Sequence, residues 1–269
     1  MARFASHDGI EIAYDIVGSG PPVLLHHGFA ADACANWEQP GIVDAIRSSG
    51  RRVITMDARG HGRSGKPHDP ASYEGLAMVR DVQALLDHLS LDSIDVIGYS
   101  MGAIVTASLL AEEPRLRSAV LGGVGARLLV RSESGAEPMP FEAIAAALEI
   151  DDPALAKGTV ARAFRAFADS TGADRLALAA IQRSRRAPVP ELSDVRVPVM
   201  VIAGDADDLI GDTAALAAMI PGARTSIVSG DHLTAVFDPR FARELVSFLD
   251  SVAAAALVEP GGALRDSTR

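Results

Sequence analysis

One serine in this sequence has the neighbours that a nucleophile needs. Ser100 is the centre of Gly98-Tyr99-Ser100-Met101-Gly102, which fits the pattern G-x-S-x-G. Residues 94–98 read as a buried strand and residues 101–110 as an apolar helix, so the sequence places Ser100 in the turn between them. Glycines suit such a turn, because the serine backbone is strained and a side chain would collide with the neighbouring strand or helix. The segment predicts a nucleophile for acyl transfer, and its alternative is a tight structural turn.

A serine hydroxyl is a weak nucleophile at neutral pH, so a base must accept its proton and a third group must orient that base. His232 follows the predicted last strand, 225–228, and is the only histidine after His88. We therefore predict that His232 is the base. An imidazolium cannot accept a proton, so activity should fall as the pH drops through about 6.5, the usual range in which histidine is protonated.

The third group, a carboxylate that would orient His232, is expected in the loop after the predicted strand 199–203. Ser100, His232 and this carboxylate would form a catalytic triad. This strand runs into Gly204-Asp205-Ala206-Asp207-Asp208. Asp207 lies three residues after Gly204, where the loop can direct its side chain back toward the histidine, whereas Asp205 and Asp208 can face solvent. We therefore predict that Asp207 orients His232. The loop after the earlier strand 119–122 is the other topological position for an acid, and it holds no carboxylate.

Two backbone amides are predicted to form an oxyanion hole. Met101 directly follows the nucleophile, and Phe29 follows His27-Gly28 at the end of another predicted strand, 23–26. His27 is predicted to hold this loop by hydrogen bonds rather than to act as a base.

No cofactor or metal is expected. The histidines at 26, 27, 61, 68 and 88 lack the spacing of metal ligands, and no phosphate-binding glycine loop is present. The segment 57–64, Asp-Ala-Arg-Gly-His-Gly-Arg-Ser, is predicted to hold the scaffold.

The bulk properties favour a cytoplasmic enzyme. A formal charge of −10 disfavours nucleic acid and anionic membranes as partners, because both would repel the chain. The N-terminus lacks the apolar run of a signal peptide, and no stretch reaches the length of a membrane span.

The lone cysteine, Cys34, cannot form an intramolecular disulfide and is expected as a small buried residue. Oligomeric state cannot be read from the sequence.

Short β-branched segments alternate with helical segments over most of the chain, which predicts an α/β fold with a mostly parallel sheet. An early antiparallel strand is expected at 10–17. Parallel strands are expected at 23–26, 53–56, 94–98, 119–122, 199–204 and 225–228, and helices at 75–89, 101–112, 212–219 and 240–254.

The alternation stops between residues 126 and 195, where helices are expected at 140–148, 153–168 and 173–185. We interpret 126–195 as a helical cap inserted into a core formed by 1–125 and 196–257, with 258–269 as a flexible tail. Phe141, Phe164 and Phe167 are candidates to line a pocket beneath the cap. The alternative is that these rings only pack the cap against the core.

Taken together, these segments resemble the α/β-hydrolase superfamily over essentially the whole chain. His27-Gly28-Phe29, the 57–64 loop, the Ser100 turn, Gly204 to Asp207 and His232 match its marker segments in order. Among its branches, the chain looks most like small cap-bearing serine esterases and cofactor-free haloperoxidase-like enzymes, or perhydrolases. The resemblance implies an eight-stranded sheet with a helical lid and an acyl-enzyme on the matching serine. Trp37 is common after the oxyanion loop in these relatives and is a further candidate to bind substrate.

The sequence differs from other branches of this superfamily at the position of the nucleophile. Haloalkane dehalogenases and epoxide hydrolases carry an aspartate where this chain has Ser100, and dienelactone hydrolases carry a cysteine there. The expected function is a carboxylesterase-like hydrolase for a small ester. A C–C bond hydrolase, a lactonase or a perhydrolase with the same triad is an alternative, and so is a ligand-binding member that does not turn over its ligand.

Overall fold

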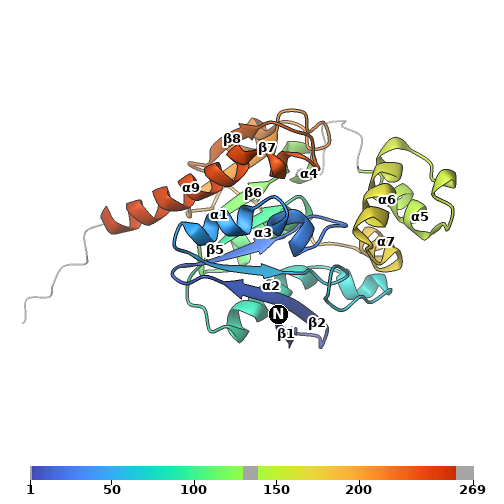
Figure 1. The fold of residues 1–269 in the computed structure, drawn as a ribbon, viewed down its shortest axis with the longest axis horizontal. Coiled ribbons are helices and arrows are strands. Elements are labelled where there is room, and N and C mark those ends of the chain that lie inside the picture. The colour runs from blue at the N-terminus through green and yellow to red at the C-terminus, as the bar shows by residue number, and fades with distance from the viewer. Residues whose placement is uncertain (1, 130–138, 259–269) are drawn as a thin grey trace, which may run out of the picture.

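The computed structural model describes residues 2–129 and 139–258 and contains an eight-stranded sheet (Figure 1). The strand order is β1-β2-β4-β3-β5-β6-β7-β8. β2 pairs antiparallel with β1 and β4, and the other neighbours pair parallel. The strands are β1 (Ala2–Ala5), β2 (Glu11–Val17), β3 (Pro22–His26), β4 (Arg52–Met56), β5 (Ile94–Tyr99), β6 (Leu116–Gly122), β7 (Val199–Gly204) and β8 (Arg224–Val228).

The predicted α/β class and mostly parallel sheet are confirmed, and each predicted strand is present. β1 was not predicted. Only Phe4 of this short strand is buried, so its sequence shows no extended apolar alternation. Its pairing with β2 supplies what the local pattern does not.

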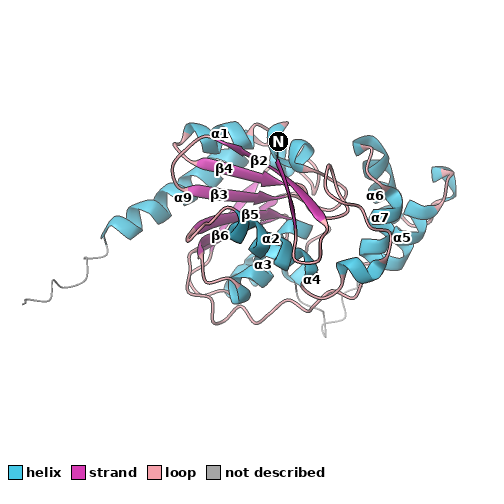
Figure 2. Cartoon of the chain, turned by 90° about the horizontal axis from the view of Figure 1, so that it is seen from below, coloured by secondary structure: helices cyan, strands magenta, loops and turns pink. Residues whose placement is uncertain are grey.

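Helices cover both faces of the sheet (Figure 2). α1 (Ile42–Ser48) packs against α9 (Pro239–Val258) on one face, and α2 (Ala77–His88), α3 (Met101–Glu112) and α8 (Thr213–Ala218) lie on the other. Residues of β3 alternate between these layers, because Leu24 joins the core cluster of α2 and α3 while Val23 and Leu25 join that of α1 and α9. This alternation is the pleat of a strand buried on both sides.

A second group of helices lies beyond the ends of the strands (Figures 1 and 2). After the short α4 (Ala126–Leu129), α5 (Phe141–Glu149) packs against both α6 (Thr159–Thr171) and α7 (Arg175–Arg183).

The predicted single helix 153–168 is wrong in one respect. Pro153–Leu155 forms a short 3₁₀ turn capped by the Asp152 carboxylate, and α6 begins only after Gly158. Gly158 has a φ of 86°, which is incompatible with a continuous helix.

The predicted flexible tail lies outside the described residues, apart from Val258. No helix within the two described ranges is both long enough and apolar enough to cross a membrane.

Candidate active site

The turn at Ser100 joins β5 directly to α3. Ser100 has φ 52° and ψ −110°, an unusual conformation for a residue with a side chain, and its N–H donates to the Gly122 carbonyl at 2.8 Å. A Cβ on Gly98 would lie 2.2 Å from the Gly102 carbonyl oxygen, and one on Gly102 would lie 2.0 Å from the His26 carbonyl oxygen. Both glycines are therefore required by close backbone contacts, which hold the strained serine at the tip of the turn.

The three residues predicted as a triad lie in one chain of hydrogen bonds. Ser100 Oγ is 2.9 Å from His232 Nε2, and His232 Nδ1 is 2.8 Å from Asp207 Oδ2. The Asp207 side chain is fully buried, whereas that of His232 retains 13% exposure. A hydroxyl, an imidazole and a buried carboxylate in this order can transfer the serine proton to the histidine.

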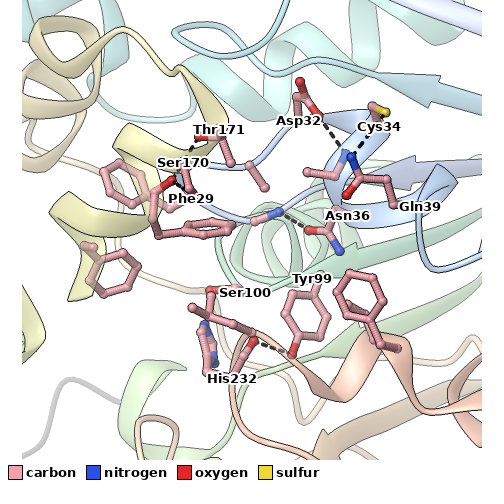
Figure 3. Close-up of a pocket in the computed structure, with 18 residues that line it drawn as sticks. Phe29, Asp32, Cys34, Asn36, Gln39, Tyr99, Ser100, Ser170, Thr171 and His232 are labelled. Atoms are coloured by element: carbon pink, nitrogen blue, oxygen red, sulfur yellow. Dashed lines mark hydrogen bonds between the residues drawn. The ribbon is translucent and has the colours of Figure 1, made fainter.

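Neighbouring groups fix the histidine loop. The Tyr99 hydroxyl donates to the His232 carbonyl oxygen at 2.8 Å, as Figure 3 shows beside Ser100. Asp205 Oδ1 accepts the Gly230 N–H at 3.0 Å. Asp205 and Asp208 are both exposed, as the sequence led us to expect, and Asp205 therefore supports the loop without contacting the imidazole.

Two backbone amides near Ser100 are free to donate. Met101 is the first residue of α3 and has no intrahelical acceptor, and no described residue accepts the Phe29 N–H. The Gly28 N–H is different, since it donates to Asn36 Oδ1 at 2.8 Å. Asn36 was not predicted as part of the site; it belongs to the π-helical turn Cys34–Glu38 and holds the loop that carries Phe29.

Buried histidines lie beneath this loop. His27 Nδ1–H donates to the Gly28 carbonyl at 2.8 Å, and its Nε2 accepts the Ala58 N–H at 2.9 Å, so the predicted structural role of His27 is confirmed. Burial lowers the pKa of His26 to about 3 and holds the pKa of His61 well below its ordinary value. All three rings are therefore neutral in the folded protein.

The 57–64 loop also has the structural role predicted for it. Asp57 accepts hydrogen bonds from the backbone of Ala33 and from the side chain of Arg63. The fully buried Arg59 side chain forms ion pairs with Asp8 and Asp81. His7, Asp8 and Asp81 lie close enough together to share a cation, but Arg59 already occupies this cluster.

A cavity of about 320 Å³ opens over Ser100 and His232 (Figure 3). Phe164 and Phe167 of α6 are among the residues that line it. Cys34 also lines it and is exposed, so the expectation that it is a small buried residue is wrong.

The prediction that Trp37 contacts substrate is not supported by its position. Trp37 is fully buried and packs edge-on against Tyr99, with ring centroids 6.5 Å apart, on the α1 and α9 side of the sheet. The π-helical turn directs Asn36 toward the loop and Trp37 into the core.

Phe141 lines a second, smaller cavity of about 40 Å³ rather than the first. This cavity is also lined by Ser100 and by the two residues with free amides, Phe29 and Met101. Arg186 closes one side, with its guanidinium carbon 5.1 Å from the centre of the Phe141 ring.

Comparison with known proteins identifies the class to which this fold and site belong. Residues 21–180 match the family described as alpha/beta hydrolase fold, and the chain belongs to that family. It is a hydrolase of this fold, with relatives that carry haloperoxidase and esterase names.

Among these relatives, a non-heme haloperoxidase from Rhodococcus erythropolis is 35% identical over 53% of this chain and 51% of its own length, so that match spans only half of the relative. A protein from Synechocystis sp. that carries the name of a non-heme chloroperoxidase is 29% identical over 82% of this chain and 87% of its own length. The solved structure of the esterase RhEst1 from Rhodococcus sp. is 26% identical, with a TM-score of 0.69 over 93% of this chain and 98% of that one.

Proposed function

We propose that this hydrolase cleaves a small carboxylic ester through an acyl-enzyme on Ser100. The observation that carries the proposal is the continuous chain of hydrogen bonds from Ser100 Oγ through His232 to Asp207. A ligand-binding protein without turnover would have no physical need for all three groups in this arrangement.

The first half of the reaction forms the acyl-enzyme. Ser100 Oγ attacks the ester carbonyl while His232 Nε2 takes its proton, and Asp207 stabilises the resulting imidazolium. The carbonyl oxygen becomes an oxyanion that accepts hydrogen bonds from the Phe29 and Met101 amides. The carbon–oxygen bond to the alcohol then breaks, and the alcohol leaves with the proton from His232.

The second half regenerates the serine. A water molecule gives a proton to His232 and attacks the acyl carbon, and the same two amides hold the second oxyanion. The bond to Ser100 Oγ breaks, the carboxylic acid is released, and Ser100 recovers its proton from the imidazolium.

The insertion supplies the walls of the substrate site in this proposal. We propose that 126–195 acts as a cap over the core of 1–125 and 196–257, because α6 contributes Phe164 and Phe167 to the cavity over Ser100. A volume of about 320 Å³ suits a small substrate. The esterase name of the RhEst1 structure adds support for ester chemistry.

A second candidate reaction is peracid formation, which the haloperoxidase names of two relatives favour. Hydrogen peroxide would replace water as the attacking molecule, and the acyl group would leave as a peracid. Ester cleavage and acyl-enzyme formation are the same in both reactions. C–C bond cleavage and lactone opening would use the same triad on other substrates.

The test compares Ser100→Ala with Ser108→Ala, a serine two turns further along α3. On p-nitrophenyl esters from acetate to octanoate, kcat of Ser100→Ala should fall by about 10⁴-fold or more, the scale seen when a triad nucleophile is removed. Ser108→Ala should retain activity, because its hydroxyl donates to the Ile104 carbonyl within α3. Undiminished hydrolysis by Ser100→Ala would overturn the proposal. Assays for peracid in the presence of hydrogen peroxide, and for hydrolysis of a lactone, distinguish these two alternative reactions from ester cleavage.

A further inference from the structure

The small cavity beside Ser100 contains a cation without an anionic partner. Arg186 is half-buried, and no described carboxylate or carbonyl oxygen accepts a hydrogen bond from its guanidinium. Arg183, at the end of α7, contrasts with it because it forms ion pairs with Glu142 and Glu149. The Arg186 guanidinium instead lies over the face of the Phe141 ring.

A second polar group in the same cavity is also unpaired. Gln182 is only 9% exposed, and no residue in the described ranges forms a hydrogen bond with its buried Oε1. Burying an amide oxygen without a partner costs free energy, as does removing a guanidinium from water without a counter-charge. Two such groups lining one cavity point to a ligand that supplies their partners.

The backbone holds Arg186 in place. The Gly75 N–H donates to the Arg185 carbonyl at 2.8 Å, and the Ala187 N–H donates to the Gly75 carbonyl at 3.1 Å. These bonds flank Arg186 on both sides and tie it to the segment that enters α2. The backbone at Arg186 is therefore fixed before any ligand binds, and its guanidinium lies over the Phe141 ring. A fixed backbone reduces the entropy lost on binding.

The chemistry of the cavity favours a carboxylate. A guanidinium presents parallel N–H donors that match the two oxygens of a carboxylate. The amide of Gln182 can turn about its terminal bond and offer its N–H₂ in place of Oε1. The volume of about 40 Å³ exceeds the roughly 10–15 Å³ of such space that one water molecule needs, so the cavity has room for one small polar group.

We propose that the substrate carries a carboxylate in addition to its reactive carbonyl, and that Arg186 and Gln182 bind this carboxylate while the carbonyl lies over Ser100. This inference rests on the proposed function and names the substrate class of that site. The substrate is then a half-ester of a dicarboxylic acid, or a lactone that bears a carboxylate. The cavity links the two ends, because Ser100, Phe29 and Met101 line it together with Arg186 and Gln182.

The kinetic test uses mono-p-nitrophenyl esters of succinate, glutarate and adipate, each paired with a neutral p-nitrophenyl ester of equal chain length. We expect at least one acidic ester to have a kcat/KM at least tenfold above its neutral partner. In Arg186→Met this acidic-to-neutral ratio should fall at least tenfold, and Arg186→Lys should restore part of it. Arg183→Gln is the matched control and should keep the wild-type ratio, since Arg183 does not line the cavity.

A binding measurement separates this inference from the proposed function. Ser100→Ala is titrated by calorimetry with the monomethyl esters of the same three diacids, and binding of one of them should weaken at least tenfold when Arg186→Met is added. Equal ratios for acidic and neutral esters in wild type and Arg186→Met, or equal binding in both titrations, would overturn the carboxylate site alone. Full activity of Ser100→Ala would instead overturn the proposed function.

Discussion

The carboxyl ends of the central strands and the helices α5 to α7 meet at the same cavity but are built differently. At the strand ends, Ser100, His232 and Asp207 are hydrogen-bonded to one another, and the glycines on both sides of Ser100 leave no room for a side chain. The helices contribute half-buried rings such as Phe164 and are followed by the unpaired Arg186. In the proposed function, the strand ends therefore carry the reacting groups, and the helices line the space for the substrate.

The largest effect should come from breaking the triad while keeping its shape. Asp207→Asn should lower kcat on p-nitrophenyl butyrate by about 10⁴-fold, because an amide neither holds the correct histidine tautomer nor stabilises the imidazolium. Steady-state kinetics on the purified variant measures this loss. Asp208→Asn is the matched control, since Asp208 is exposed and lies one residue away. A similar loss in both variants would contradict the assignment of the acid.

A pair of phenylalanine-to-alanine substitutions tests the difference between the two regions. Phe241 is fully buried and packs against Tyr99, with ring centroids 5.9 Å apart, so Phe241→Ala should lower the free energy of unfolding by about 3–5 kcal/mol. Phe164→Ala removes a half-buried ring from the cavity wall and should cost about 1 kcal/mol or less in stability. It should instead change KM across the series from acetate to octanoate. Urea unfolding and ester kinetics on both variants measure these two effects, and the reverse pattern would contradict the comparison.

A more gradual effect should appear on acidification. His26 and His61 stay neutral in the fold because burial lowers the pKa of each, whereas in the unfolded chain both take up protons below about pH 6.5. The unfolded state then binds more protons, so the free energy of unfolding should fall by about 1.4 kcal/mol per pH unit for each histidine, between pH about 6.5 and the lower folded-state values.

Urea unfolding at pH 7, 6 and 5 measures this loss. Ester hydrolysis measured at the same pH values tests a separate expectation, that a histidine base loses its function when it takes up a proton. The two effects separate when activity is assayed briefly at a pH where the chain remains folded. Stability that stays constant from pH 7 to 5 would contradict the neutral state of the buried histidines.

Much of the fold could be predicted because its parallel strands are buried on both faces and appear as short apolar runs. Met101–Glu112 was predicted without error because a strained turn and a charged segment delimit it. β1 and α1 were not predicted, since both are short and gain their stability from packing on β2 and α9. The split at Gly158 was missed because a glycine inside an amphipathic pattern does not reveal its φ angle.

The site was predictable to the extent that chain topology limits the choices. A single histidine after the last strand and a carboxylate-rich loop after β7 left few candidates for the base and acid. Trp37 was misplaced because a position close to the loop does not tell which way a side chain points. Asn36, Gln182 and Arg186 gave no signal in the sequence, since folding decides which polar side chains find a partner, as Asn36 does, and which do not.

The most direct test of the central claim is to trap the nucleophile. The protein is treated with a p-nitrophenyl phosphonate, and the modified peptide is mapped by mass spectrometry. Our account expects one adduct, on Ser100, with release of one p-nitrophenol per chain and with no adduct in Ser100→Ala. An adduct on another residue, or continued hydrolysis of p-nitrophenyl butyrate after complete modification of Ser100, would contradict it.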